Sequence, residues 1–213
     1  MIHLSKRNTK LVKTSGEAYK VVGWGIPADH NFGAGMNTCP AATACKAVCY
    51  AKQGRYVMGA AVTNRLDNLD ESQAPAFVAD MIRSLRSARS FNVVRVHDSG
   101  DFYSQEYLDR WYAVARALPD KIFYAYTKRM DLDLWSHKPD NFRLVQSLGG
   151  KHDKLVDMSR PHSRIFASEA ARDAAGYADG NANDIPAIEG VVNIGLVYHG
   201  VKKLTAAQAK YFG

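Results

Sequence analysis

Short runs of apolar and β-branched residues alternate along this chain with longer stretches in which apolar residues recur every three or four positions. The short runs are typical of buried strands, and most of them end at proline, glycine or a polar residue. They lie at Val21–Pro27, Phe91–His97, Ile122–Tyr126, Phe142–Gln146, Leu155–Met158, Ile165–Ala167 and Val191–Tyr198. Each run predicts one strand.

The longer stretches predict amphipathic helices between the strands. After Ser72, for example, Phe77, Met81 and Leu85 share one helical face, and arginines occupy the opposite face. We expect helices at Arg55–Asp70, from the cap Ser72 to Ala88, from the cap Ser104 to Leu118, at Asp131–His137, at Ser168–Ala175 and from Thr205 onwards, with a loop at Asn181–Pro186. Such alternation predicts an α/β fold with a parallel sheet, in a single domain spanning residues 1–213.

All three cysteines lie in one short loop, Thr38–Tyr50, at Cys39, Cys45 and Cys49. Structural cysteines scatter along a sequence, whereas metal ligands cluster, because the thiolates must converge on one centre. Disulfides take cysteines in pairs and closed zinc sites need four ligands, so three thiolates suit an iron–sulfur cubane with one open iron. The alternative is a zinc site that a nearby histidine, such as His30, completes.

Polar residues follow the predicted strands. In parallel α/β folds the binding or active site lies at the carboxyl ends of the strands. The polar residues at those ends are His97 to Asp101, Thr127 to Arg129, Ser147, Ser159, Arg160 and His199. One polar residue after a strand is usually a turn or a helix cap. It is their coincidence at several strand ends that predicts a site lining.

Composition narrows the class of protein. The chain has 213 residues, of which 46% are hydrophobic and 23% are charged, as in an ordinary soluble protein. No apolar run reaches the length of a membrane span, and the polar start does not resemble a signal peptide. We therefore expect no membrane partner and a cytoplasmic location, where reducing conditions also preserve thiolate ligands.

The charge distribution indicates which kind of partner the protein could bind. A net charge of +7 suits an anionic partner such as nucleic acid. The first twenty residues carry Lys6, Arg7, Lys10, Lys13 and Lys20. Glu17 is the only acidic residue among them. This segment, about residues 1–20, predicts either a basic arm that contacts phosphates or a solvated N-terminal extension.

The cysteine loop, followed by the triplet Ser99–Asp101 after a predicted strand, resembles the radical S-adenosylmethionine (SAM) enzymes. The segment Asn8–Lys10, the cysteine loop, the SGDF segment that starts at Ser99 and the triplet Thr127–Arg129 resemble more closely the phage gene product 88 family and related radical-SAM-like phage proteins. This resemblance covers about residues 8 to 150. It implies an α/β fold in the form of a partial (β/α) barrel of about six parallel strands with outer helices.

The resemblance also implies a [4Fe–4S] cluster on the three cysteines, with SAM at the open iron. The residues it implies in contacts to SAM are His97, Ser99, Gly100, Asp101, Thr127, Lys128, Arg129 and Ser147. Asp101 would hold the methionine ammonium, and Lys128 or Arg129 the carboxylate. An electron from a donor would cleave SAM, and the resulting 5′-deoxyadenosyl radical would take hydrogen from a substrate. Phage origin and positive charge suggest nucleic acid or a nucleotide as that substrate.

Two features differ from the radical SAM pattern. That pattern spaces its cysteines CxxxCxxC, whereas five residues separate Cys39 from Cys45 and three separate Cys45 from Cys49. Asp101 stands where those enzymes have a glutamate, and it is shorter by one methylene. Two other classes of function therefore stay open: a zinc-containing nucleic-acid-binding protein, and a cluster-bearing binding or regulatory protein without turnover.

Overall fold

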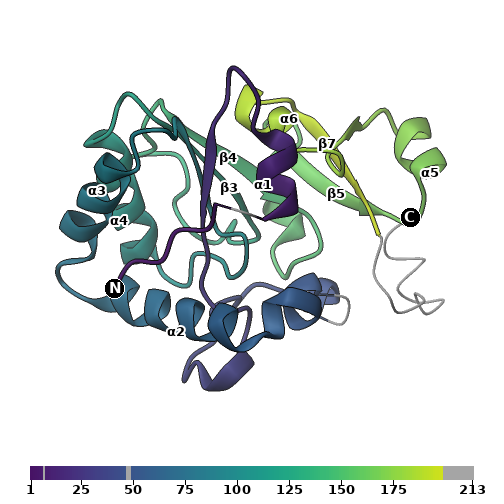
Figure 1. The fold of residues 1–213 in the computed structure, drawn as a ribbon. Coiled ribbons are helices and arrows are strands. Elements are labelled where there is room, and N and C mark those ends of the chain that lie inside the picture. The colour runs from purple at the N-terminus through teal and green to yellow at the C-terminus, as the bar shows by residue number, and fades with distance from the viewer. Residues whose placement is uncertain (7, 47–48, 199–213) are drawn as a thin grey trace.

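A seven-stranded parallel sheet forms the centre of the protein. The computed structural model describes residues 1–6, 8–46 and 49–198. The strands are β1 (Val21–Trp24), β2 (Val93–Val96), β3 (Ile122–Thr127), β4 (Phe142–Ser147), β5 (His162–Phe166), β6 (Ala178–Asp179) and β7 (Asn193–Val197). Their order is β1-β2-β3-β4-β5-β7-β6, and the sheet curls into a half-barrel (Figure 1). The expected partial barrel is confirmed. The two-residue strand β6 was not predicted from the sequence.

Helices cover both faces of this sheet. The α-helices are α1 (Thr9–Thr14), α2 (Gly59–Gln73), α3 (Phe77–Ser87), α4 (Gln105–Arg116), α5 (Glu169–Ala174) and α6 (Ile185–Glu189). Short 3₁₀ turns lie at η1 (Asn31–Gly33), η2 (Ala44–Lys46), η3 (Tyr50–Lys52), η4 (Gly54–Val57) and η5 (Asp153–Leu155). Side chains of α3 and α4 pack on one face, whereas α1 and α6 pack on the other. No helix in the described part of the chain is long and apolar enough to cross a membrane.

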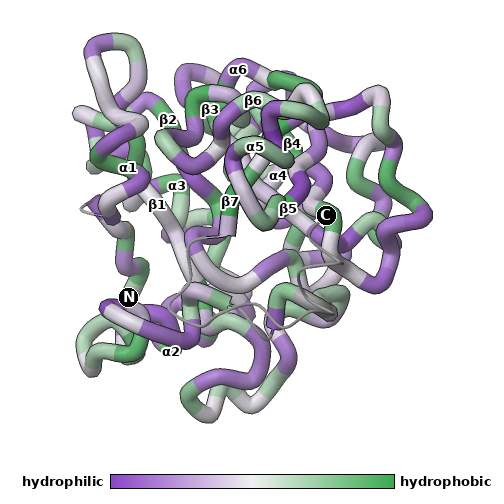
Figure 2. The backbone as a smooth tube through the Cα atoms, turned by 90° about the vertical axis from the view of Figure 1, so that its right-hand side faces the viewer, coloured by the Kyte–Doolittle hydropathy of each residue, from purple (hydrophilic) through white to green (hydrophobic). Residues whose placement is uncertain are grey.

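The central strands bury apolar residues on both faces, because helices cover both faces of the sheet. In β2, Val94 and Val96 join the cluster under α3 and α4, whereas Val93 joins the cluster under α1 and α6. The first cluster is rich in aromatic rings, with Trp24 in edge contact with Trp111. α2 is mostly hydrophilic (Figure 2) and buries only three residues, Asn68, Leu69 and Ser72.

Parallel pairing aligns the ends of the strands. Trp24 of β1 lies opposite Val96 of β2, and Val96 lies opposite Ala125 of β3. Since the strands are parallel, their carboxyl ends lie along one edge of the sheet. The chain leaves that edge after β1 and β2 into the cysteine loop and the turn 98–101, so these two segments lie at the same end of the half-barrel.

The expected helix cap at Ser72 is wrong. Ser72 lies inside α2, where its hydroxyl donates a hydrogen bond to the Leu69 carbonyl at 2.6 Å, and α3 begins only after Ala76. The cap at Ser104 is confirmed, because its oxygen accepts a hydrogen bond from a backbone N–H of the first helical turn. The helix expected at Ser168–Ala175 is α5, and Ser168 caps it in the same way.

Two further expected elements are turns instead. In Asp131–His137, the Asp133 carboxylate accepts hydrogen bonds from the two backbone amides at positions 135 and 136, which competes with a helix. In Leu155–Met158, the backbone of Asp157 pairs with the side chain of Gln146 rather than with a strand. Both predictions failed because side chains supply the partners that a helix or a sheet would have supplied.

The structure describes the C-terminal part of the chain only as far as residue 198. α6 begins at Ile185, inside the expected loop Asn181–Pro186, with proline in its first turn, where no backbone N–H is needed. The helix expected from Thr205 and the strand end at His199 lie outside the described residues.

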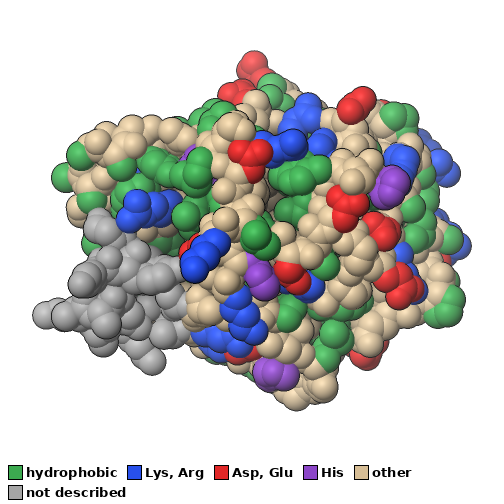
Figure 3. All heavy atoms as spheres, turned by 180° about the vertical axis from the view of Figure 1, so that it is seen from behind, with side chains coloured by type: hydrophobic (Ala, Val, Ile, Leu, Met, Phe, Trp, Pro, Cys, Tyr) green, Lys and Arg blue, Asp and Glu red, His purple; other side chains and the backbone are tan. Residues whose placement is uncertain are grey.

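The N-terminal segment is not a solvated extension. α1 buries Leu11 against the sheet, and the Lys10 ammonium lies 2.9 Å from the buried Asp184 carboxylate. Ser5 also pairs with Gly23 in an antiparallel bridge. Lys6 and Lys13 are exposed, while Arg7 lies outside the described residues. On the face shown in Figure 3, basic and acidic side chains are interspersed.

Candidate functional site

The cysteine loop is fastened at both ends to the turn that follows β2. The Asp101 backbone N–H donates to the Thr38 carbonyl at 3.0 Å, one residue before the first cysteine. The Tyr50 hydroxyl, one residue after the last cysteine, donates to the Asp98 carbonyl at 2.6 Å. The loop and the triplet Ser99–Asp101, which are far apart in sequence, therefore form one unit.

The middle of the loop is fastened to the segment after β4. The Lys151 N–H donates to the Ala41 carbonyl at 2.8 Å, and the Thr43 hydroxyl donates to the Gly149 carbonyl at 3.0 Å. Gly150 allows this approach, because a Cβ there would come within 3.0 Å of the Ala41 oxygen. The loop thus contacts the segments that follow β2 and β4 at the carboxyl edge of the sheet.

The three thiols are free, partly buried and close enough to influence one another. Burial, Asp101 and the other two cysteines together raise the pKa of Cys39 to about 12, although the Asp29 N–H, 3.4 Å from its sulfur, opposes this. Burial likewise raises the pKa of Cys49, and the N–H groups of Ala51 and Lys52 lower it. Amide donors aimed at sulfur stabilise thiolates, and a bound metal displaces the thiol proton.

The described residues contain no preformed site for a single metal ion. No three His, Cys, Asp or Glu side chains among the described residues are gathered as the ligands of one metal ion. The zinc arrangement of the three cysteines with His30 is therefore not formed in this structure. The loop supplies three thiols, and the chain has no fourth cysteine.

Four of the predicted SAM-binding residues lie in one hydrogen-bonded chain. The Asp101 carboxylate accepts from the Thr127 hydroxyl at 2.6 Å, from the Lys128 N–H at 2.9 Å and from the Phe102 N–H at 2.7 Å. The Lys128 ammonium donates to the Ser147 hydroxyl at 2.7 Å. Burial raises the pKa of Asp101 despite these hydrogen bonds. Asp101 thus joins β2 to β3, and Lys128 joins β3 to β4.

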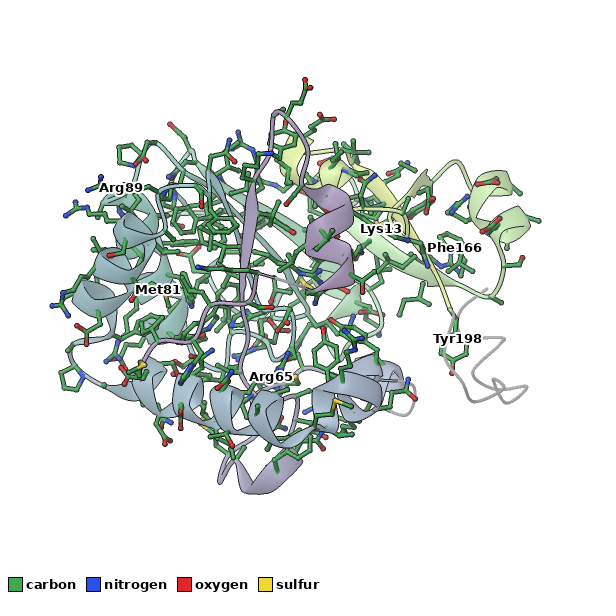
Figure 4. All side chains as sticks on the ribbon, viewed as in Figure 1. Lys13, Arg65, Met81, Arg89, Phe166 and Tyr198 are labelled. Atoms are coloured by element: carbon green, nitrogen blue, oxygen red, sulfur yellow. The ribbon has the colours of Figure 1, made fainter. Side chains whose placement is uncertain are left out.

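Ser99 and Gly100 shape the turn. The Ser99 hydroxyl donates to the Ile26 carbonyl at 2.7 Å and accepts from the Arg65 guanidinium at 2.8 Å. Arg65 reaches it from the side of α2 that faces the sheet (Figure 4). Gly100 has φ +81°, and a Cβ there would lie 2.3 Å from an Ile26 side-chain carbon. Glycine is therefore required for the turn to pack on the end of β1.

His97 lies in the core rather than among the site residues. Its backbone adopts φ +69°, and its ring packs on Phe102 and bonds the Tyr107 hydroxyl at 3.0 Å. Strand alternation would have sent the side chain to the other face of the sheet, but the left-handed backbone turns it into the aromatic cluster. Arg129 is also engaged, by the Phe102 carbonyl and by Asp131.

Because His97 is buried, we expect the stability of the protein to depend on pH. Burial lowers the pKa of His97 to about 3, below its usual value of 6.5, so the unfolded state binds the extra proton between these values. The free energy of unfolding should therefore fall as the pH falls below about 6.5, by about 2 kcal/mol at pH 5, and should not change from this cause above pH 7. Urea unfolding at pH 7 and pH 5 measures the difference.

The variant His97→Asn checks the assignment. Asparagine tolerates the left-handed backbone but does not titrate in this range, so its profile should be flatter. The matched control is His137→Asn, at an exposed histidine. A slope in His97→Asn as steep as in the parent protein would contradict the prediction.

The sequence reading missed a polar cluster on the other face of the sheet. It consists of Lys10, Arg95, Tyr124, Tyr126 and Asp184, and we call it the inner polar cluster. A signal existed at Arg95, because a charged residue interrupts the apolar strand Val93–Val96. Asp184 gave no signal, since it sits in a polar stretch far along the chain.

Fold and site together define the class of protein: a parallel α/β half-barrel whose carboxyl edge carries a three-thiol loop. The model of the gene product 88 family matches residues 3–210, so the chain belongs to that family. It is 27% identical over 151 residues to the Gene 88 protein of Mycobacterium phage D29, covering 60% of this chain and 61% of that protein.

A second relative is the Gene 88 protein of Mycobacterium phage L5. The two chains are 29% identical over 136 residues, which cover 58% of this chain and 55% of the relative. The chain thus spans less than two thirds of the length of the curated relatives it matches. No solved structure matches it significantly.

Proposed function

We propose that this protein is a radical SAM-type enzyme that binds a [4Fe–4S] cluster through Cys39, Cys45 and Cys49 and SAM at the open iron. The observation that carries the proposal is the loop with all three cysteines, which is fastened at both ends to the turn Asp98–Asp101 at the carboxyl edge of a parallel half-barrel. Together the cluster and SAM would supply reductive cleavage of a carbon–sulfur bond for radical chemistry on a substrate, with an electron donor of unknown identity.

The chain's own residues would position these groups. The Asp29 N–H would stabilise the Cys39 thiolate, and the N–H groups at Ala51 and Lys52 the Cys49 thiolate. Asp101 is buried beside Cys39 and raises its pKa, which supports a role in holding the SAM ammonium near the cluster. Thiolate ligands require a reducing compartment, which for a phage protein would be the host cytoplasm.

The substitution Asp101→Asn tests the SAM site. It should weaken SAM binding about tenfold while leaving iron content unchanged, because an ammonium gains more from a carboxylate than from a neutral amide. Isothermal titration of the anaerobic, reconstituted protein measures the affinity. Asp109→Asn is the control, since it makes the same chemical change at an exposed aspartate of α4 away from the triplet. Equal SAM affinity in Asp101→Asn and the parent protein would mean that the triplet only shapes a turn.

The second candidate is a cluster-bearing binding or regulatory protein without turnover. Two side chains favour it because they are already hydrogen-bonded within the protein rather than free for SAM. The Asp101 carboxylate accepts three hydrogen bonds, and the Ser99 hydroxyl is engaged by Ile26 and Arg65. Cleavage of SAM by the reduced protein separates the candidates. Production of methionine and 5′-deoxyadenosine supports the enzyme, whereas SAM binding without cleavage supports the second candidate.

A further inference from the structure

The inner polar cluster occupies a defined level of the half-barrel. Along β2, Val93 comes first and belongs to the apolar layer under α1 and α6. Arg95 follows on the same face, because side chains alternate along a strand. The turn 98–101, which holds the cysteine loop, comes last. Arg95 and its partners therefore lie between the apolar layer and the proposed metal site.

The cluster has more positive than negative charge. The fully buried Asp184 carboxylate lies 2.9 Å from the Lys10 ammonium and 2.9 Å from the Arg95 guanidinium, and it accepts from the Tyr124 hydroxyl at 2.9 Å. Burial alone would raise the pKa of Asp184, but Arg95 and Lys10 hold it below its usual value. The cluster itself thus holds two cations and one carboxylate. The other carboxylates that act on Arg95 and Lys10 are Asp98 and Asp179, which form ion pairs with Arg65 and Arg172.

Arg95 has an unused donor. Its side chain is only 10% exposed, and its Nε is buried without a hydrogen-bond partner among the described residues. A buried unpaired N–H is costly, and natural structures satisfy nearly all of them. Burial also lowers the pKa of Lys10 even though Asp184 raises it. Both features would be relieved by a second anion placed beside Arg95 and Lys10.

Aromatic side chains connect this level to the cysteine loop. The half-exposed Tyr50 ring, next to Cys49, contacts the Tyr56 ring edge-on at 5.4 Å. The Asn8 side chain, which caps α1 and accepts from the Lys10 N–H, also donates to the Tyr56 hydroxyl at 3.1 Å, so this aromatic pair lies beside the Lys10 end of the cluster. A molecule whose anionic group is bound at Arg95 would therefore also lie near the cysteine loop, where we propose the metal site.

We propose that Arg95 and Lys10 bind a carboxylate or phosphate group of a small-molecule substrate, with the rings of Tyr50 and Tyr56 beside that molecule. Calling this molecule a substrate rests on the proposed function, whereas the anion site itself does not depend on that function. The bound molecule is small because the anion must enter the protein to reach a guanidinium that is 10% exposed. The backbone of a nucleic-acid duplex cannot reach that depth.

Titration with inorganic phosphate tests the site in the full chain without a cluster, at constant ionic strength set with sodium chloride. The parent protein should bind phosphate saturably by isothermal titration. Lys10→Gln keeps the Arg95–Asp184 pair and should weaken binding at least about tenfold, since it removes a charge-assisted contact. Lys13→Gln is the matched control, because Lys13 lies on the same short helix but is exposed, and it should bind as the parent does (Figure 4).

Arg95→Gln should lose phosphate binding as well, and circular dichroism shows whether it still folds. If it does not fold, Lys10→Gln decides alone. Phosphate binding that is no stronger than that of chloride, or an equal affinity in Lys10→Gln and Lys13→Gln, would overturn the anion site.

A second titration distinguishes substrate from cofactor. In reconstituted protein, Lys10→Gln should leave SAM affinity unchanged. If it weakens SAM as much as it weakens phosphate, the anion is the cofactor's own carboxylate and the substrate assignment is wrong. A protein that binds phosphate but takes up no cluster would keep the anion site and overturn its assignment to a radical SAM substrate.

Discussion

Replacement of any one of Cys39, Cys45 and Cys49 by alanine should abolish the brown colour and the iron of the anaerobically reconstituted protein. The parent chain should carry about four irons, as expected for three-thiolate cubane ligation. The effect should be all-or-none, because the chain has three cysteines and no spare thiol can replace a lost one. Iron and sulfide assays with a visible absorption spectrum measure it.

Thr43→Ala is the matched control within the same loop. It removes the hydrogen bond to the Gly149 carbonyl and leaves every thiol in place, so it should retain the cluster. Stoichiometric zinc in preparations grown with ample iron would contradict the prediction, and so would full iron content in a cysteine variant. Zinc together with nucleic-acid binding would favour the zinc-containing class instead.

The second large effect is expected on stability. Asp184→Asn should lower the free energy of unfolding by about 3–5 kcal/mol, because it removes the carboxylate that pairs with the buried Arg95 and the partly buried Lys10. The same carboxylate connects α1, β2, β3 and α6, so its loss affects four elements at once. Denaturant unfolding at neutral pH gives the difference from the parent protein.

Asp80→Asn provides the comparison for that effect. Asp80 pairs with Arg83, whose side chain is 75% exposed, and an exposed pair contributes less than about 1 kcal/mol. Equal losses of stability in the two variants would mean that the Asp184 pair is no stronger than a surface pair.

The sequence predicted best what local pattern controls. β2, β3 and β4 contain mostly apolar runs, and Ser104 caps its helix through its own side chain. The failures have tertiary causes. Ser72 resembles a cap, but α2 continues through it, and Leu155–Met158 resembles a strand, but a glutamine side chain takes its backbone partners.

The candidate site divides in the same way. The rule that the carboxyl ends of parallel strands share one edge predicted that Asp101, Thr127, Lys128 and Ser147 lie together, and hydrogen bonds join them in the structure. The rule failed for His97, because a left-handed backbone reverses the direction of its side chain. The ion pair of Arg95 with Asp184 could not be predicted from the sequence, since 89 positions separate the two residues.

The half-barrel is open, and an open parallel sheet exposes two edges to which a strand of another molecule could add. At one edge, Ser5 and Gly23 exchange two backbone hydrogen bonds, of 2.7 and 2.8 Å, in the middle of β1. At the other edge, β6 is two residues long and offers few free backbone groups. The chain's own first residues and a very short last strand thus protect the protein against edge-to-edge aggregation, while the carboxyl end carries the cysteine loop.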